Sequence, residues 1–199
     1  MKRACWLFVG LALSWPALAA AQHVDHKPGP GEVEKLGTVE FKTSCSAAAQ
    51  PRMNRAVALL HSFQFSGAVA DFEQAQQVDP ACAIAYWGVA LSRWGNPFGV
   101  GLKAPAQLQQ GGDAVARARK LTPKTERERA YIEAVARLYT DFENVSQRDR
   151  LLAYRNAMAD VAARYPDDRE ASIFYALSLA ASEEEIERGV REICAFADR

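Results

Sequence analysis

Apolar residues recur at helical spacing along most of the chain, in segments separated by turn-forming residues. The clearest region is 52–94, where two segments meet at Ser66-Gly67 and a third begins directly after Asp79-Pro80. The Gly- and Pro-rich stretch 95–101 then interrupts the pattern. The pattern predicts seven helices, at about 44–62, 67–78, 81–94, 105–121, 126–141, 147–165 and 170–181.

Small and large residues alternate within the first three predicted helices in the way that closely packed helices require. Small residues fall at Ala56, Ala68, Ala75 and Ala90, and large ones at Leu59, Phe72 and Tyr86. The order Ala68, Phe72, Ala75, Pro80 matches the second half of a tetratricopeptide repeat. Helix-closing prolines then follow at 80, 123 and 166, which are 43 residues apart each time. We therefore expect an all-α, tetratricopeptide-like solenoid of three and a half to four repeats, rather than an unrelated helical bundle.

The first 43 residues differ from the helical remainder. Residues 1–21 join a basic start at Lys2 and Arg3 to an apolar run of 12 residues and then to a small-residue cleavage site, which is typical of a secretory signal peptide. Residues 22–43 predict an extended or disordered leader, and residues 44–199 the helical domain. These features predict an exported protein, periplasmic or secreted, without a membrane span after cleavage.

The leader offers one metal-binding alternative. His23 and His26, with Asp25 between them, lie close to the N-terminus that cleavage would create. Imidazole nitrogens suit copper and nickel, so a metal-handling protein that uses this tail is a second hypothesis. A titration of the mature protein with copper separates it from a plain solvated tail.

Charge and motifs argue against several functional classes. Lys and Arg total 24 and Asp and Glu total 24, a balance that does not favour nucleic acid as a partner. The chain has no glycine-rich phosphate loop, no nucleophile elbow and no zinc-spaced Cys/His cluster, and His61 is the only histidine of the predicted domain. We expect no enzymatic activity and no cofactor.

Three cysteines remain once the signal segment is removed. Cys45 and Cys82 each precede a predicted helix, and the starts of these two helices would lie on one edge of a solenoid. We expect them to form a disulfide, with two unpaired apolar cysteines as the alternative. Cys194 would then be the free thiol.

One face of the first and third predicted helices carries the candidate binding site. Trp87 and Trp94 are seven residues apart and so lie on the same helix face. Aromatic and Met side chains on the concave face of a solenoid would anchor a protein or peptide. The predicted groove comprises Met53, Leu60, His61, Trp87, Leu91 and Trp94. Alternatively, the leader or the loop 95–104 covers these residues as ordinary core.

The C-terminal segment predicts a further, closing helix. Ser182 followed by Glu185 forms a capping box. An apolar stripe then follows at Ile186, Val190, Ile193 and Ala197. An accidental, frayed ending is the alternative.

Three stretches resemble a family of exported bacterial tetratricopeptide-repeat proteins: LGTVEFKTSC, RAVALLHSFQF and DPACAIAYWGVALSRWGNPF. The resemblance covers residues 36–181 and is most specific at 43–45, 59–63 and 79–87. It implies the fold and export but supplies no catalytic residues. Chains of that family carry more repeats, and 182–199 departs from their pattern, so a shortened copy of a longer protein is a further hypothesis. The sequence as a whole favours a binding or scaffold module of the bacterial cell envelope.

Overall fold

The computed structural model describes residues 36–99 and 101–197, with side chains described through Glu183 and again at Glu187. Within these residues the chain forms seven α-helices, one short 3-10 helix and no β-strand, which confirms the all-α prediction. The elements are α1 (Gln50–His61), α2 (Phe65–Val78), α3 (Ala83–Trp94), α4 (Pro105–Lys120), α5 (Glu126–Ala136), η1 (Arg137–Tyr139), α6 (Gln147–Arg164) and α7 (Arg169–Ala197).

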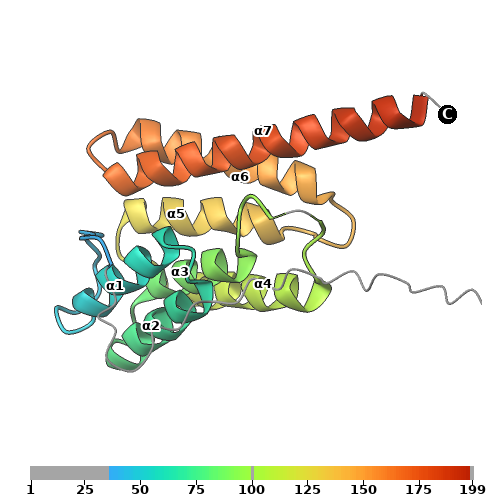
Figure 1. Cartoon of the computed structure of the whole chain (residues 1–199). Helices are drawn as coiled ribbons and strands as arrows, with labels where there is room; N and C mark the ends of the chain where they lie inside the picture. The colour runs from blue at the N-terminus through green and yellow to red at the C-terminus, as the bar shows by residue number, and fades with distance from the viewer. Residues whose placement is uncertain (1–35, 100, 198–199) are drawn as a thin grey trace, which may run out of the picture.

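Each α-helix packs against the next one along the chain, and α3 also packs against α1 and α5. Figure 1 shows α6 and α7 along one side of the molecule, α1 to α4 along the opposite side, and α5 between them. Pro80, Pro123 and Pro166 follow the ends of α2, α4 and α6 by two or three residues, as the sequence predicts. Proline cannot continue a helix, so these positions set where the chain turns back.

Two glycines allow elements to approach more closely than any side chain would permit. A Cβ atom on Gly88 of α3 would lie 2.3 Å from the ring of Phe72 of α2. A Cβ atom on Gly111 of α4 would lie 2.2 Å from the ring of Tyr139. Both rings are buried, so the core is built around these missing side chains.

The first helix begins later than the serine residues suggest. It starts at Gln50, because Ser44 and Ser46 are held by distant carboxylates rather than capping a helix. The backbone N–H and hydroxyl of Ser44 donate to the two carboxylate oxygens of Glu128, each at 2.6 Å. The Ser46 N–H donates to Asp79 at 2.7 Å.

The C-terminal helix differs most from expectation. The sequence predicts a break near residue 181 and a new helix capped by Ser182, but α7 runs unbroken from Arg169 to Ala197. The Ser182 hydroxyl donates to the Leu179 carbonyl at 2.8 Å within the same helix, so it caps nothing. The capping-box prediction is wrong because no Gly or Pro stops the preceding helix. The apolar stripe at residues 186–197 and Cys194 lie outside the described side chains.

The end of the leader belongs to the core. Residues 36–43 form neither helix nor strand, yet Phe41 is fully buried. Its ring stacks on Trp87 at 5.1 Å between centroids. Side chains of α1 hold its backbone: the Phe41 N–H donates to Asn54 Oδ1 at 3.2 Å, and its carbonyl accepts from Gln50 Nε2 at 2.7 Å.

Trp87 is the centre of an aromatic cluster that joins five segments of the chain. Its ring meets Phe41 of the leader, Phe72 of α2, Tyr131 of α5 and Phe174 of α7, with centroid distances of 5.1, 6.3, 5.2 and 5.3 Å. Edge-to-face and offset-stacked pairs of this kind add to the stabilisation from burial alone. The cluster therefore links the leader to α7 through Trp87.

The predicted disulfide is present. Cys45 and Cys82 are bonded with a Cα–Cα distance of 4.9 Å, and the bond ties the end of the leader to the start of α3. No helix within the described part of the chain is both long and apolar enough to cross a membrane. The predicted signal segment 1–21 lies outside the described residues.

Candidate functional site

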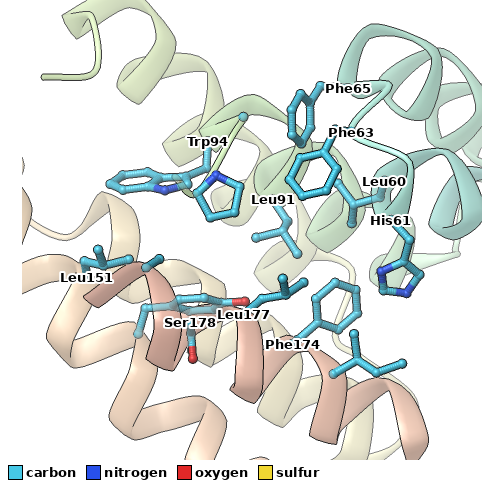
Figure 2. Close-up of a pocket in the computed structure, with 15 residues that line it drawn as sticks. Leu60, His61, Phe63, Phe65, Leu91, Trp94, Leu151, Phe174, Leu177 and Ser178 are labelled. Atoms are coloured by element: carbon cyan, nitrogen blue, oxygen red, sulfur yellow. The ribbon is translucent and has the colours of Figure 1, made fainter. Parts of the chain in front are cut away.

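A pocket of about 350 Å³ opens between α1 and α3 on one side and α6 and α7 on the other. Four of the six predicted groove residues line it: Leu60, His61, Leu91 and Trp94. Figure 2 shows them on the wall that faces Leu151 of α6 and Phe174 of α7. The same wall also carries Phe63 from the turn after α1, Phe65 at the start of α2, and Gly95 and Pro97 from the loop after α3.

The other two predicted groove residues belong to the core, so this part of the prediction is wrong. Met53 and Trp87 are both fully buried and do not line the pocket. Trp87 does share a helix face with Trp94, as its spacing requires. Along that face, however, Phe41 and Phe174 cover the indole ring of Trp87. The alternative that the leader covers this face holds at Trp87, and the pocket begins one turn further along α3.

His61 lies at one edge of the pocket and joins the two walls. Its Nε2 atom lies 2.6 Å from the Glu170 carboxylate, across a sequence separation of 109 residues. Its ring stacks on Phe174 at 5.1 Å. Because Glu170 and Phe174 both belong to α7, these two contacts of His61 hold α7 near the end of α1.

Behind this edge, two polar side chains of α5 bind Asp168, the residue before α7. Arg127 Nε and the Tyr131 hydroxyl both donate to Asp168 Oδ2, at 2.6 and 2.8 Å. Burial, with the Asp168 charge added, raises the pKa of Tyr131 above its ordinary range. The Arg127 guanidinium also lies 4.8 Å from the Phe41 ring centroid and donates to the Lys42 carbonyl at 2.8 Å. These contacts fix the leader to the domain and leave the three groups engaged with one another.

Trp94 forms the opposite end of the pocket, and three side chains outside the pocket lining contact its ring. Two cations, Lys103 Nζ and the Arg150 guanidinium, lie 5.5 and 5.7 Å from its ring centroid. Tyr139 packs edge-on against the ring at 6.1 Å. Burial lowers the pKa of both Lys103 and Arg150. Trp94 itself is only 4% exposed, so its replacement would destabilise the fold as well as alter the pocket.

The lining is predominantly apolar and contains no Lys, Arg, Asp or Glu. Its polar side chains are His61, Tyr154 and Ser178. His61 is paired with Glu170, and the Ser178 hydroxyl donates to the Tyr175 carbonyl at 2.7 Å. Burial raises the pKa of Tyr154, which stays neutral. A lining of this composition suits the burial of an apolar group.

The α7 wall of the pocket is absent from the prediction. Its residues recur at helical spacing along one face of α7: Ile173, Phe174, Leu177, Ser178 and Ala181. Their spacing is visible in the sequence, yet it cannot show that this face lies opposite α1 and α3. That placement depends on contacts between distant segments, such as the one between His61 and Glu170.

Among the side chains that the structure describes, no cluster of three or more His, Cys, Asp or Glu is arranged to hold a metal ion. The candidate copper or nickel ligands His23, Asp25 and His26 lie outside the described residues. The leader-based metal hypothesis therefore stays a prediction.

Comparison of the chain with known protein families, with curated proteins and with solved structures finds no match. The function is therefore inferred from the geometry and chemistry of the pocket.

Proposed function

We propose that this chain is a non-catalytic binding module that holds a partner protein or peptide through the pocket between α1, α3, α6 and α7. The pocket carries the proposal: a predominantly apolar cavity of about 350 Å³, without Lys, Arg, Asp or Glu in its lining, that opens at the surface. Its volume lies in the range of pockets that bind ligands, and aromatic anchors in such pockets dominate many protein interfaces.

The order of the helices supports a tetratricopeptide-like architecture. The odd-numbered helices start at residues 50, 83, 126 and 169, so the intervals are 33, 43 and 43 residues. The first interval is close to the 34-residue length of the repeat. The longer intervals accommodate the loop after α3, and the 16- and 18-residue helices α4 and α6. In such a solenoid the first helix of each hairpin faces the concave side, where α1 and α3 contribute their residues to the pocket.

The expected location is outside the cytoplasm. The signal-like residues 1–21 and the Cys45–Cys82 disulfide both favour an exported protein, because structural disulfides persist in oxidising compartments. We place the module in the bacterial periplasm or among secreted proteins, with a protein or peptide of the envelope as its partner.

Affinity capture from an envelope extract tests this function with two matched variants. Leu91→Gln places a polar group in the pocket wall with little change of volume, while Leu102→Gln makes the same change at a residue that is 86% exposed. A polypeptide retained by the wild type and by L102Q but lost with L91Q supports the proposal. Equal retention by all three proteins contradicts it.

A further inference from the structure

Phe63 has an unfavourable backbone conformation at the mouth of the pocket. Its φ angle is +58°, in the left-handed region that bulky residues rarely adopt. Phe63 follows Ser62, the C-cap of α1, in a Schellman motif that ends the helix with two backbone hydrogen bonds. The Gln64 N–H donates to the Leu59 carbonyl at 2.9 Å, and the Phe63 N–H to the Leu60 carbonyl at 3.1 Å. Glycine is the usual residue at this position because it has no Cβ.

The Phe63 side chain is also more exposed than an aromatic ring of the core. It is 42% exposed and packs beside Phe65 and Phe98, with centroid distances of 5.9 and 6.3 Å. Ile173, on the opposite lip, is 41% exposed and lines the same pocket. Strained backbone and exposed apolar side chains both work against stability, and their coincidence at a pocket mouth is typical of ligand clamps.

The lining determines what can enter between these lips. Burying a charge without a partner is very unfavourable, and none of the lining residues is Lys, Arg, Asp or Glu. His61 and Ser178 already bind groups of the protein. Apart from the Tyr154 hydroxyl and the Trp94 indole N–H, the lining has no other polar side-chain group to offer a peptide backbone. An engineered apolar cavity of about 150 Å³ holds one benzene molecule, so about 350 Å³ accommodates an indole ring or a pair of aliphatic side chains.

We infer that the pocket receives one bulky, uncharged apolar side chain of the partner peptide, and that Phe63 is the specificity-determining clamp at its mouth. The inference rests on the proposed function and names the chemistry that this function requires. The peptide backbone stays outside, across Phe63 and its aromatic neighbours, where its polar groups keep their contacts with water.

The test uses the full chain and the uncharged fluorescent probe N-phenyl-1-naphthylamine. Phe63→Gly removes the ring and suits the backbone, so we expect probe affinity to fall roughly five-fold while the melting temperature stays equal or rises. Thr122→Gly is the matched control, because Thr122 also has a positive φ, of 52°, and does not line the pocket. Ile173→Ser, on the other lip, should weaken the probe similarly. Unchanged probe affinity in F63G and I173S overturns the inference.

Capped pentapeptides of sequence Ala-Ala-X-Ala-Ala then identify the side chain. Peptides with Trp or Leu at X should displace the probe from the wild type, and those with Asp or Lys should not. Equal displacement by charged peptides overturns the inference even where a partner is captured. Conversely, failure of partner capture with intact Trp and Leu selectivity counts against the scaffold role alone.

Discussion

Phe41→Ala is the substitution that most clearly tests whether the leader is part of the folded unit. Phe41 precedes every helix, yet it is fully buried. Its ring stacks on Trp87 at 5.1 Å and meets Tyr131 edge-on at 5.5 Å. The Arg127 guanidinium lies 4.8 Å from the same ring. Truncation to Ala would remove all three contacts and leave a cavity beside Trp87.

The expected loss of stability follows from these contacts. A buried Phe→Ala substitution costs about 3–5 kcal/mol, from lost transfer free energy and the residual cavity. This empirical range already includes the lost contacts of the ring, so we expect about 4 kcal/mol. For a domain of this size the melting temperature should fall by about 8–16 °C.

Urea unfolding of the wild type, F41A and Glu40→Ala measures the effect. Glu40 is the exposed neighbour of Phe41, so its substitution should change the free energy of unfolding by less than about 0.5 kcal/mol. Acrylamide should quench tryptophan fluorescence more strongly in F41A, because Trp87 loses its cover. A loss below about 1 kcal/mol in F41A would refute the assignment of the leader to the core.

Three further predictions concern stability. Gly88→Ala should destabilise the protein by about 1–3 kcal/mol, because the added methyl group overlaps the Phe72 ring, and a melting temperature equal to that of the wild type would contradict this. Removing the Cys45–Cys82 bond should cost about 4 kcal/mol of loop-closure entropy. Labelling of the denatured, unreduced protein should show these two thiols blocked, and reactivity at both would contradict the bond. The third prediction is that the free energy of unfolding begins to depend on pH near pH 10. Burial raises the pKa of three tyrosines: Tyr131, Tyr139 and Tyr154. The unfolded chain then loses protons that the folded chain keeps, so the free energy of unfolding should fall above pH 10 by up to about 1.4 kcal/mol per pH unit for each tyrosine. The chain has six tyrosines, so absorbance from more than three phenolates before unfolding would contradict this.

Local signals in the sequence were sufficient for most helices. Prolines at 80, 123 and 166 ended helices as predicted, and the hydroxyl groups of Thr125 and Ser146 cap α5 and α6. These features depend on neighbours within a few residues, so a single sequence reveals them.

Two errors concern short polar patterns that resemble helix caps. Ser44 resembles a helix cap, but it binds Glu128, 84 residues away. Ser182 and Glu185 match a capping box, but the helix had no reason to stop before them. In both cases the tertiary structure, rather than the local capping preference, determined where the helix begins or ends.

The sequence predicted one wall of the pocket, from α1 and α3, but not the other. Helical spacing put Leu60, Leu91 and Trp94 on one surface, which is where they lie. The opposite wall comes from α6 and α7, and nothing local shows that α7 packs against α1. The backbone strain at Phe63 is also invisible in the sequence, since its φ angle depends on how α1 ends.

Site-specific photo-crosslinking tests most directly whether this pocket is where a partner binds. A benzophenone amino acid placed at position 63, at the pocket mouth, would be irradiated in intact cells alongside the same amino acid at position 122. Thr122 is exposed and does not line the pocket. We predict an adduct with a second polypeptide from position 63 alone, attached close to a bulky apolar residue of the partner. Adducts from position 122 alone, or adducts from position 63 only within this chain, would contradict the proposed function.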